Sequence, residues 1–266
     1  MHKRSLRLPL LASCLLAALL VATPIAQTQI VPNGPAIPPV ALTGGGSPPP
    51  AATEACSAAL LVDASVAERF EVIGRGHADR LLPMADELLR DAGLRPRDLS
   101  GIAFGRGPGG FTGIRIAAGL AQGLAAGSER PILPVSNLAA IAAGAAREVR
   151  ATRILACMDA RMGQVYWAAY DCSTVAPVVI SGEHLAKPDD VEPPPGPSWF
   201  GAGHGFAGYP AIAARLGGRL SGTDAARLPR ASDIARIAAA DLGTGKGLHA
   251  AGGLPVYLRD EVVHRR

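Results

Sequence analysis

The alternation of strand-like and helix-like segments constrains the fold of this chain more than any other feature of its sequence. From Thr53 onward, short apolar runs with strand character precede stretches with helical spacing, first over residues 53–150 and again over residues 151–266. Strands that alternate with helices build layers in which the helices cover a sheet. The sequence therefore predicts an α/β fold with two lobes, of which the second ends in a C-terminal segment that returns to the core.

Residues 1–52 differ in character from the rest of the chain. Residues 1–26 have a basic start and an apolar run, which is the layout of a secretory signal and is too short for a comfortable transmembrane helix. Residues 27–52 are rich in proline and glycine, so we expect a disordered linker that forms neither a helix nor a paired central strand. Taken alone, this head favours export or a membrane anchor.

Charge and cysteine content argue against several classes of function. The chain has 26 Lys and Arg against 22 Asp and Glu, and three of the basic residues, Lys3, Arg4 and Arg7, lie in the head. The near-neutral remainder has no global footprint for nucleic acid, although a local basic patch is compatible with it. The four cysteines form neither a CxxC pair nor a zinc-site spacing. RNA binding by this chain alone is not expected.

A glycine-rich segment, GRGPGGFTGIR at residues 105–115, separates a predicted strand from a predicted helix. Glycine frees backbone amides that can bind phosphate at the start of a helix, but the segment lacks the Lys-Ser/Thr pair of a Walker motif and the dinucleotide fingerprint. Thr112 is the expected N-cap of the helix. Candidates for a nucleotide contact are Gly107, Gly109, Gly110 and Arg115, with Arg106 beside them.

The helix after this loop carries Gly119, Gly123 and Gly127 at four-residue intervals. Each glycine inside a helix costs about 1 kcal/mol relative to alanine, so the row indicates the close approach of another helix. The alternative is an ordinary buried helix whose small residues reflect a chain composition that is rich in small residues. An amphipathic helix is also predicted over residues 78–92, either beginning near Leu82 or kinked at Pro83.

No catalytic constellation is evident in the sequence. His77 opens a predicted helix, Asp159 precedes a turn in MDARMG, and His204 lies among glycines in GAGHGF, where a ligand could approach. No Cys, His or carboxylate stands at metal-ligand spacing beside His204, and no triad or carboxylate pair is present.

Six segments, in order from about Thr53 to the C-terminus, resemble one family. They are TEACSAAL, HADRLLPMADELL, GRGPGGFTGIRIAAGLAQGLA, PVSNLAAIA, MDARMGQVYWAAY and PVYLRDEV. Together they resemble the TsaB family, also called YeaZ, the bacterial partner protein in threonylcarbamoyladenosine modification of tRNA. The resemblance implies an actin-like, two-lobe fold of the sugar kinase, Hsp70 and actin type, which is RNase H-like and related to the TsaD subunit that transfers the threonylcarbamoyl group.

The resemblance also implies a role. It implies a cytoplasmic, non-catalytic subunit that binds and activates TsaD for transfer of the threonylcarbamoyl group to the tRNA adenosine next to the anticodon. A TsaE-like ATPase and tRNA are expected to join through the complex, and a homodimer is expected when TsaD is missing. TsaD-like relatives bind a metal through an HxxxH pair, whereas Asn137 and Ile141 stand at the matching positions here. ATP and metal are therefore expected on the partner subunits and not on this chain. The alternatives are a degenerate or exported actin-like protein and a self-standing ATPase or peptidase.

In the family, the first helix and the helix after the glycine loop contact TsaD, and they match residues 77–92 and 114–127 here. Relatives begin with a strand that ends in Asp-Thr, whereas Pro50 and Ala51 stand at that place. The first strand is thus expected to be missing or replaced, for which the segment QTQIVP is the candidate, and nucleotide binding is in doubt. The predicted partner interface consists of Leu81, Ala85, Leu88, Leu89, Gly119, Gly123 and Gly127.

Overall fold

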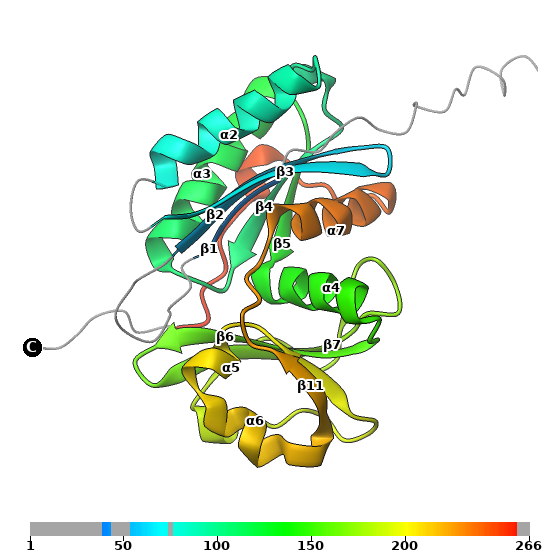
Figure 1. Cartoon of the computed structure of the whole chain (residues 1–266). Coiled ribbons are helices and arrows are strands. Elements are labelled where there is room, and N and C mark those ends of the chain that lie inside the picture. The colour runs from blue at the N-terminus through cyan, green and yellow to red at the C-terminus, as the bar shows by residue number, and fades with distance from the viewer. Residues whose placement is uncertain (1–38, 44–53, 74–76, 260–266) are drawn as a thin grey trace, which may run out of the picture. The chain divides into compact units, whose positions relative to one another are not determined.

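The computed structural model describes residues 39–43, 54–73 and 77–259, which build two β-sheets with helices packed on them (Figure 1). The first sheet has the strand order β3-β2-β1-β4-β5. β2 pairs antiparallel with β3 and with β1, whereas β1, β4 and β5 run parallel. Its strands are β1 (Pro39–Thr43), β2 (Glu54–Val62), β3 (Ser65–Ile73), β4 (Ile102–Gly107) and β5 (Ile132–Ser136).

The central strand β1 corrects the expectation that residues 27–52 contain no paired strand. Residues 40–43 pair with residues 55–58 of β2, and Pro39 and Val40 pair with Ala103 and Phe104 of β4. The prolines lie on both sides of VALT but not in it, and Pro39 is the first residue of the strand, where a missing N–H is tolerated. The first strand is therefore replaced by β1, while the segment QTQIVP and residues 1–26 lie outside the described residues.

The side chains along the strands of the first sheet alternate between two cores, and a layer of helices covers each face of the sheet. Along β4, Ile102 and Phe104 join the cluster beneath α2 and α3, whereas Ala103 joins the cluster beneath α4 and α7. Both faces are thus buried, as in α/β proteins with a largely parallel sheet. The helices are α2 (His77–Asp91), which continues through Pro83, α3 (Phe111–Ser128), α4 (Asn137–Val149) and α7 (Ala231–Gly243).

The second sheet has the order β11-β10-β6-β7-β8, with β9 also paired to β7. Residues 205–216 form two short helices instead of one, because Pro210 opens the second one. The elements of this sheet and its helices are β6 (Arg153–Arg161), β7 (Gln164–Asp171), β8 (Val178–Val179), β9 (His184–Ala186), β10 (Trp199–Ala202), β11 (Leu220–Asp224), α5 (Gly205–Gly208) and α6 (Pro210–Leu216). Short 3-10 turns are η1 (Pro96–Asp98), η2 (Pro188–Asp190), η3 (Gly217–Arg219) and η4 (Ala250–Gly252).

The end of the chain returns from the second sheet to the first. α7 packs against the first sheet beside α4 (Figure 1), and Leu248 bridges Ile132 at the edge strand β5. Residues 254–259, here called the C-terminal strap, then pass the loop after β4 and reach the end of β6, where Arg259 donates to the carbonyl oxygen of Ala160 at 2.9 Å.

None of the helices in the described part of the chain is both long enough and apolar enough to cross a membrane.

Candidate partner interface

The glycines of α3 form an exposed row, here called the glycine face, which consists of Gly119, Gly123 and Gly127. A Cβ atom added to any of the three would meet none of the described residues within 4 Å. The opposite side of the helix is closed by Ala117 and Ala121, which are fully buried against the sheet. The three glycines therefore serve no packing against the part of the chain that the structure describes, and there they are exposed, unlike in the buried-helix alternative.

Partly buried apolar side chains flank the glycine face on α3, and one exposed leucine lies on the neighbouring helix α2. Ile116, Leu120 and Leu124 are partly buried along the same helix, and Leu82 on α2 is 47% exposed. A row of glycines edged by leucine and isoleucine allows the backbone of a second helix to approach closely while apolar groups are covered. This surface is the strongest candidate for an interface on the described residues.

The apolar stripe of α2 does not contribute to that surface, contrary to the sequence prediction. Leu81, Ala85, Leu88 and Leu89 are between 0% and 5% exposed and belong to the core between α2, α3 and the first sheet. A helix that covers a sheet uses its apolar stripe for its own core, and only the opposite side remains for a partner. The side of α2 that remains open is therefore the one that carries Leu82.

The glycine loop, residues 105–110, is filled by the chain itself. Gly107 has φ +111°, and a Cβ there would lie 2.7 Å from the carbonyl oxygen of Val256 in the C-terminal strap. The backbone amide of Val256 donates to the carbonyl oxygen of Arg106 at 2.8 Å. A Cβ at Gly109 would lie 3.4 Å from Nδ2 of Asn137. The glycines of this loop therefore make room for the strap and for α4.

The helix after this loop is not capped by Thr112, which is exposed within its first turn. α3 begins at Phe111 with Gly110 as its N-cap, and no side chain caps it. The prediction placed the helix start too late because it gave a side-chain cap more weight than the glycine before Phe111.

The two arginines beside the loop already have partners in this chain. Arg106 forms a half-buried ion pair with Glu183 at 2.9 Å. Arg115 donates through Nε to the hydroxyl oxygen of Tyr257 at 2.8 Å, and its guanidinium lies 3.7 Å from the ring centroid of Phe111. A nucleotide at this loop stays a prediction, and it would have to displace the strap or break these contacts.

The positions that match the HxxxH pair have structural roles. Asn137 is fully buried and donates through Nδ2 to the carbonyl oxygen of Pro108 at 3.0 Å, which ties α4 to the glycine loop. Ile141 is fully buried in the core. Within residues 39–43, 54–73 and 77–259, no three His, Cys, Asp or Glu side chains gather in a way that could hold a metal ion.

The remaining candidates, Asp159 and His204, lie close together at the end of β6. Burial lowers the pKa of His204 to about 4, although the Asp159 carboxylate opposes that shift. Asp159 accepts hydrogen bonds from the amide of Arg161 at 2.8 Å and the hydroxyl of Tyr209 at 3.3 Å, which is the local role of an aspartate at a turn. The glycines on both sides of His204 pack on Cys157 and leave no room for a ligand there. The side chain of His77 lies outside the described residues.

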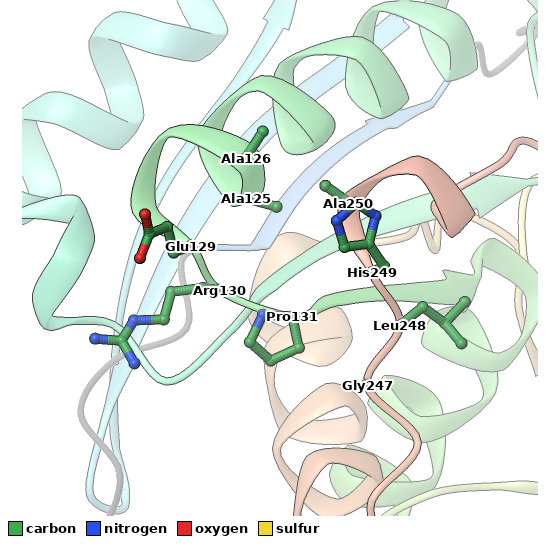
Figure 2. Close-up of a pocket in the computed structure, with 9 residues that line it drawn as sticks. All are labelled: Ala125, Ala126, Glu129, Arg130, Pro131, Gly247, Leu248, His249 and Ala250. Atoms are coloured by element: carbon green, nitrogen blue, oxygen red, sulfur yellow. The ribbon is translucent and has the colours of Figure 1, made fainter.

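A pocket of about 540 Å³ lies at the C-terminal end of α3 (Figure 2). Figure 2 shows Ala125 and Ala126 on the helix, Glu129 and Arg130 on one side, and Leu248 and His249 on the other. Sequence reasoning missed it because its two walls are far apart along the chain. The pocket borders the C-terminal end of α3, the helix that carries the glycine face. Its lining residues are Ala125, Ala126, Glu129, Arg130, Pro131, Gly247, Leu248, His249 and Ala250.

Comparison with known proteins agrees with this architecture. A family model described as TsaD, tRNA N6-adenosine threonylcarbamoyltransferase, matches residues 70–240. The chain is 40% identical over 221 residues to the tRNA threonylcarbamoyladenosine biosynthesis protein TsaB of Escherichia coli, covering 81% of this chain and 94% of that protein. It is 35% identical over 223 residues to the Haemophilus influenzae protein of the same name, covering 80% and 93%.

A solved structure of YeaZ from Pseudomonas aeruginosa matches with a TM-score of 0.73 and 41% identity, covering 84% of this chain and all of that one. The fold is thus an actin-like α/β fold of the type found in TsaD, as expected from the sequence. The chain belongs to the TsaB family, also called YeaZ.

Proposed function

We propose that this chain is the non-catalytic partner subunit in threonylcarbamoyladenosine biosynthesis. In this role it binds a TsaD-type transferase and activates threonylcarbamoyl transfer to the tRNA adenosine next to the anticodon, while a TsaE-type ATPase joins the same complex. Membership in the family whose members are named for this pathway supports the proposal. The role belongs in the cytoplasm, where tRNA is modified, and fractionation of cells that express a C-terminally tagged chain tests that location.

The observation that carries the proposal is the glycine face. Three glycines inside one helix lower its stability by about 1 kcal/mol each relative to alanine. None of the residues described by the structure approaches them within 4 Å of an added Cβ atom. A helix of a partner that packs across them would need the space that a Cβ atom fills. The proposed interface consists of Gly119, Gly123 and Gly127 with Ile116, Leu120, Leu124 and Leu82 around them.

The test replaces Gly119 and Gly123 together with leucine. Overpacking at a close helix crossing should weaken binding to the TsaD-type transferase by about 100-fold or more. Isothermal titration of the purified proteins gives the dissociation constant, and urea unfolding shows whether the variant remains folded. The matched control is Gly243→Leu, which also adds a side chain into open space on an exposed helical glycine, but on α7 at the other face of the first sheet.

Two outcomes would contradict the proposal. Absence of any complex with the transferase at micromolar concentrations would remove the partner role. Equal affinities for the double variant and the Gly243→Leu control would remove the glycine face as the interface. Sedimentation of the chain alone tests the homodimer, which should use the same face and be lost in the same variant.

A further inference from the structure

A strip of exposed aromatic and arginine side chains crosses from α3 to the end of β6. It begins with Phe111, which is 41% exposed, and Arg115, whose guanidinium lies 3.7 Å from the Phe111 ring centroid and 5.5 Å from that of Tyr257. The rings of Phe111 and Tyr257 are themselves 5.5 Å apart. This end of the strip is thus a cluster of two tilted aromatic rings in contact with each other and a guanidinium over the Phe111 ring, and all three side chains are exposed.

The strip continues along the C-terminal strap to the β6-β7 turn. Arg259, two residues after Tyr257, donates to the carbonyl oxygen of Ala160 at 2.9 Å and contacts the sulfur of Met162 at 2.9 Å. Arg161 in the same turn is exposed, and Met162 is 68% exposed. The aromatic-arginine strip consists of Phe111, Arg115, Arg161, Met162, Tyr257 and Arg259.

The arginines of the strip are not neutralised by acidic side chains of the described residues. No carboxylate there lies within ion-pair distance of Arg115, Arg161 or Arg259, although most of the other described arginines, such as Arg106, form ion pairs. Asp159 lies near Arg161, but its Oδ1 accepts hydrogen bonds from the Arg161 amide and from Tyr209, and it forms no ion pair with the Arg161 guanidinium. Among the described residues, the strip therefore presents positive charge without an ion-pair partner beside aromatic rings.

This combination fits single-stranded or looped RNA. Guanidinium groups pair with phosphate oxygens, and exposed rings or arginine planes accept the faces of unstacked bases. Protein interfaces also use tyrosine and arginine, but they bury them in a packed apolar patch. Here three arginines lie beside two exposed rings and no packed apolar patch surrounds them among the described residues, which favours a polyanion.

We propose that the aromatic-arginine strip contacts tRNA in the assembled complex. The proposal rests on the proposed function, since it is the complex that brings the tRNA. The strip starts in the first turn of α3, the helix that carries the glycine face, so an RNA held by a partner on that face can extend onto it. Because the chain is near neutral, we expect the strip to bind RNA only weakly by itself. In the complex it would add contacts to RNA that the complex already holds.

The experiment measures the affinity of a fluorescently labelled, unmodified tRNA by anisotropy for the complex of the full chain with the TsaD-type transferase. Arg161→Glu reverses an exposed charge, and its matched control is Arg150→Glu at the opposite end of β6. Both arginines are exposed and both have positive φ, +64° and +55°, so the backbone cost is similar. We expect Arg161→Glu to weaken tRNA binding by about five-fold or more at low salt, with a salt dependence reduced by about one phosphate contact.

A second pair of variants isolates the ring. Tyr257→Leu removes a stacking surface and should weaken tRNA binding by about five-fold or more, whereas Tyr257→Phe keeps the ring and should change it by less than about two-fold. Equal effects of Arg161→Glu and Arg150→Glu, or unchanged binding in Tyr257→Leu, would overturn the proposal. Loss of transferase binding in Arg161→Glu would assign the strip to a protein partner instead.

The isolated chain provides an arm that does not depend on the partner. Titrated with the same tRNA at low salt, the chain should bind weakly, and Arg161→Glu should lower that binding while Arg150→Glu leaves it unchanged. If no complex with the transferase forms, the proposed function fails, but the titration of the isolated chain still tests whether the strip binds tRNA. Equal tRNA binding by the two isolated variants in that case would overturn it.

Discussion

The backbone amide of Val256 donates a hydrogen bond to the carbonyl oxygen of Arg106 over 2.8 Å. This contact holds the C-terminal strap against the glycine loop, at the place where a nucleotide-binding protein of similar layout would receive phosphate. In this chain the loop binds another part of the same polypeptide. Its glycines are needed for the approach of two backbones, and this need can be tested directly.

Gly107→Ala should destabilise the chain by about 2 kcal/mol or more, because the residue has φ +111° and the new Cβ would meet the Val256 carbonyl oxygen. Gly93→Ala is the control, since Gly93 has φ +68° but open space around it. Urea unfolding measures both. A cost for Gly107→Ala no larger than that of Gly93→Ala would show that the strap does not press on this position.

Alanine at the glycine face should have opposite effects on stability and on binding. Gly119→Ala and Gly123→Ala are each expected to stabilise the isolated chain by up to about 1 kcal/mol, because the added methyl groups favour the helix and clash with nothing. The reverse change at the exposed Ala126, Ala126→Gly, should destabilise it by a similar amount. The same alanine variants should bind the transferase more weakly. Tighter or unchanged binding would mean that no helix crosses the glycines closely.

His204 should make the chain less stable in mild acid. Burial lowers the pKa of His204 from 6.5 to about 4, so the folded state holds the neutral ring while the unfolded state takes up a proton. Its contribution is complete above pH 6.5 and is lost as the pH falls through 4, which amounts to about 2 kcal/mol between pH 7 and pH 5. His204→Leu should remove this part of the pH dependence. Urea unfolding at the two pH values gives the change in the free energy of unfolding between pH 7 and pH 5. An equal change for the original chain and for His204→Leu would refute the assignment.

Asp233 is predicted to be the most costly carboxylate to remove. Its side chain is fully buried, and Oδ1 accepts a hydrogen bond from Arg147 at 2.5 Å while Oδ2 lies 3.8 Å from the buried Arg227. Burial raises the pKa of Asp233, and both arginines oppose that shift. Asp233→Ala leaves the Arg227 charge less compensated and should cost about 3 kcal/mol or more. Arg150→Ala, an exposed change on the same lobe, should cost less than about 0.5 kcal/mol. Comparable melting curves for the two variants would contradict this.

The central strand β1 should be required for stability. A chain that lacks residues 1–38 retains β1, and one that lacks residues 1–43 does not. The second should melt at a clearly lower temperature than the first, because residues 55–58 of β2 and Ala103 and Phe104 of β4 lose their ladder partners. Calorimetry of the two proteins measures the effect. Equal melting temperatures would show that the sheet does not depend on β1.

The fold was predictable where local pattern and tertiary packing agree. The spacing of Leu81, Ala85 and Leu88 predicts α2, and that helix forms because the same stripe packs on the first sheet. The strand at Pro39–Thr43 was not predictable, because its pairing depends on β2 and β4 on either side and not on its own proline-rich surroundings. Local composition describes what a segment prefers alone, whereas a central strand is stabilised by its neighbours.

The candidate interface was predictable in part for a similar reason. The four-residue interval of Gly119, Gly123 and Gly127 predicts a face for close approach, and the structure leaves that face open. The same reasoning failed for Leu89, because an apolar stripe is compatible with a partner or with the helix's own sheet, and burial alone separates the two. The aromatic-arginine strip had no signal in the sequence, since Arg115 and Tyr257 meet only through the path of the strap.

The return of α7 and the strap to the first sheet also bears on how the chain is made. The strands of the first sheet have all been translated by residue 136. One face of that sheet is not fully covered until α7, which ends at Gly243, has been synthesised, and the glycine loop lacks its hydrogen bond until Val256 has been added. A chain emerging from the ribosome therefore cannot complete its first lobe before the second has been synthesised. Until α7 and the strap have been synthesised, the alanine-rich face of the first sheet is exposed, which is a state in which partly folded chains tend to aggregate.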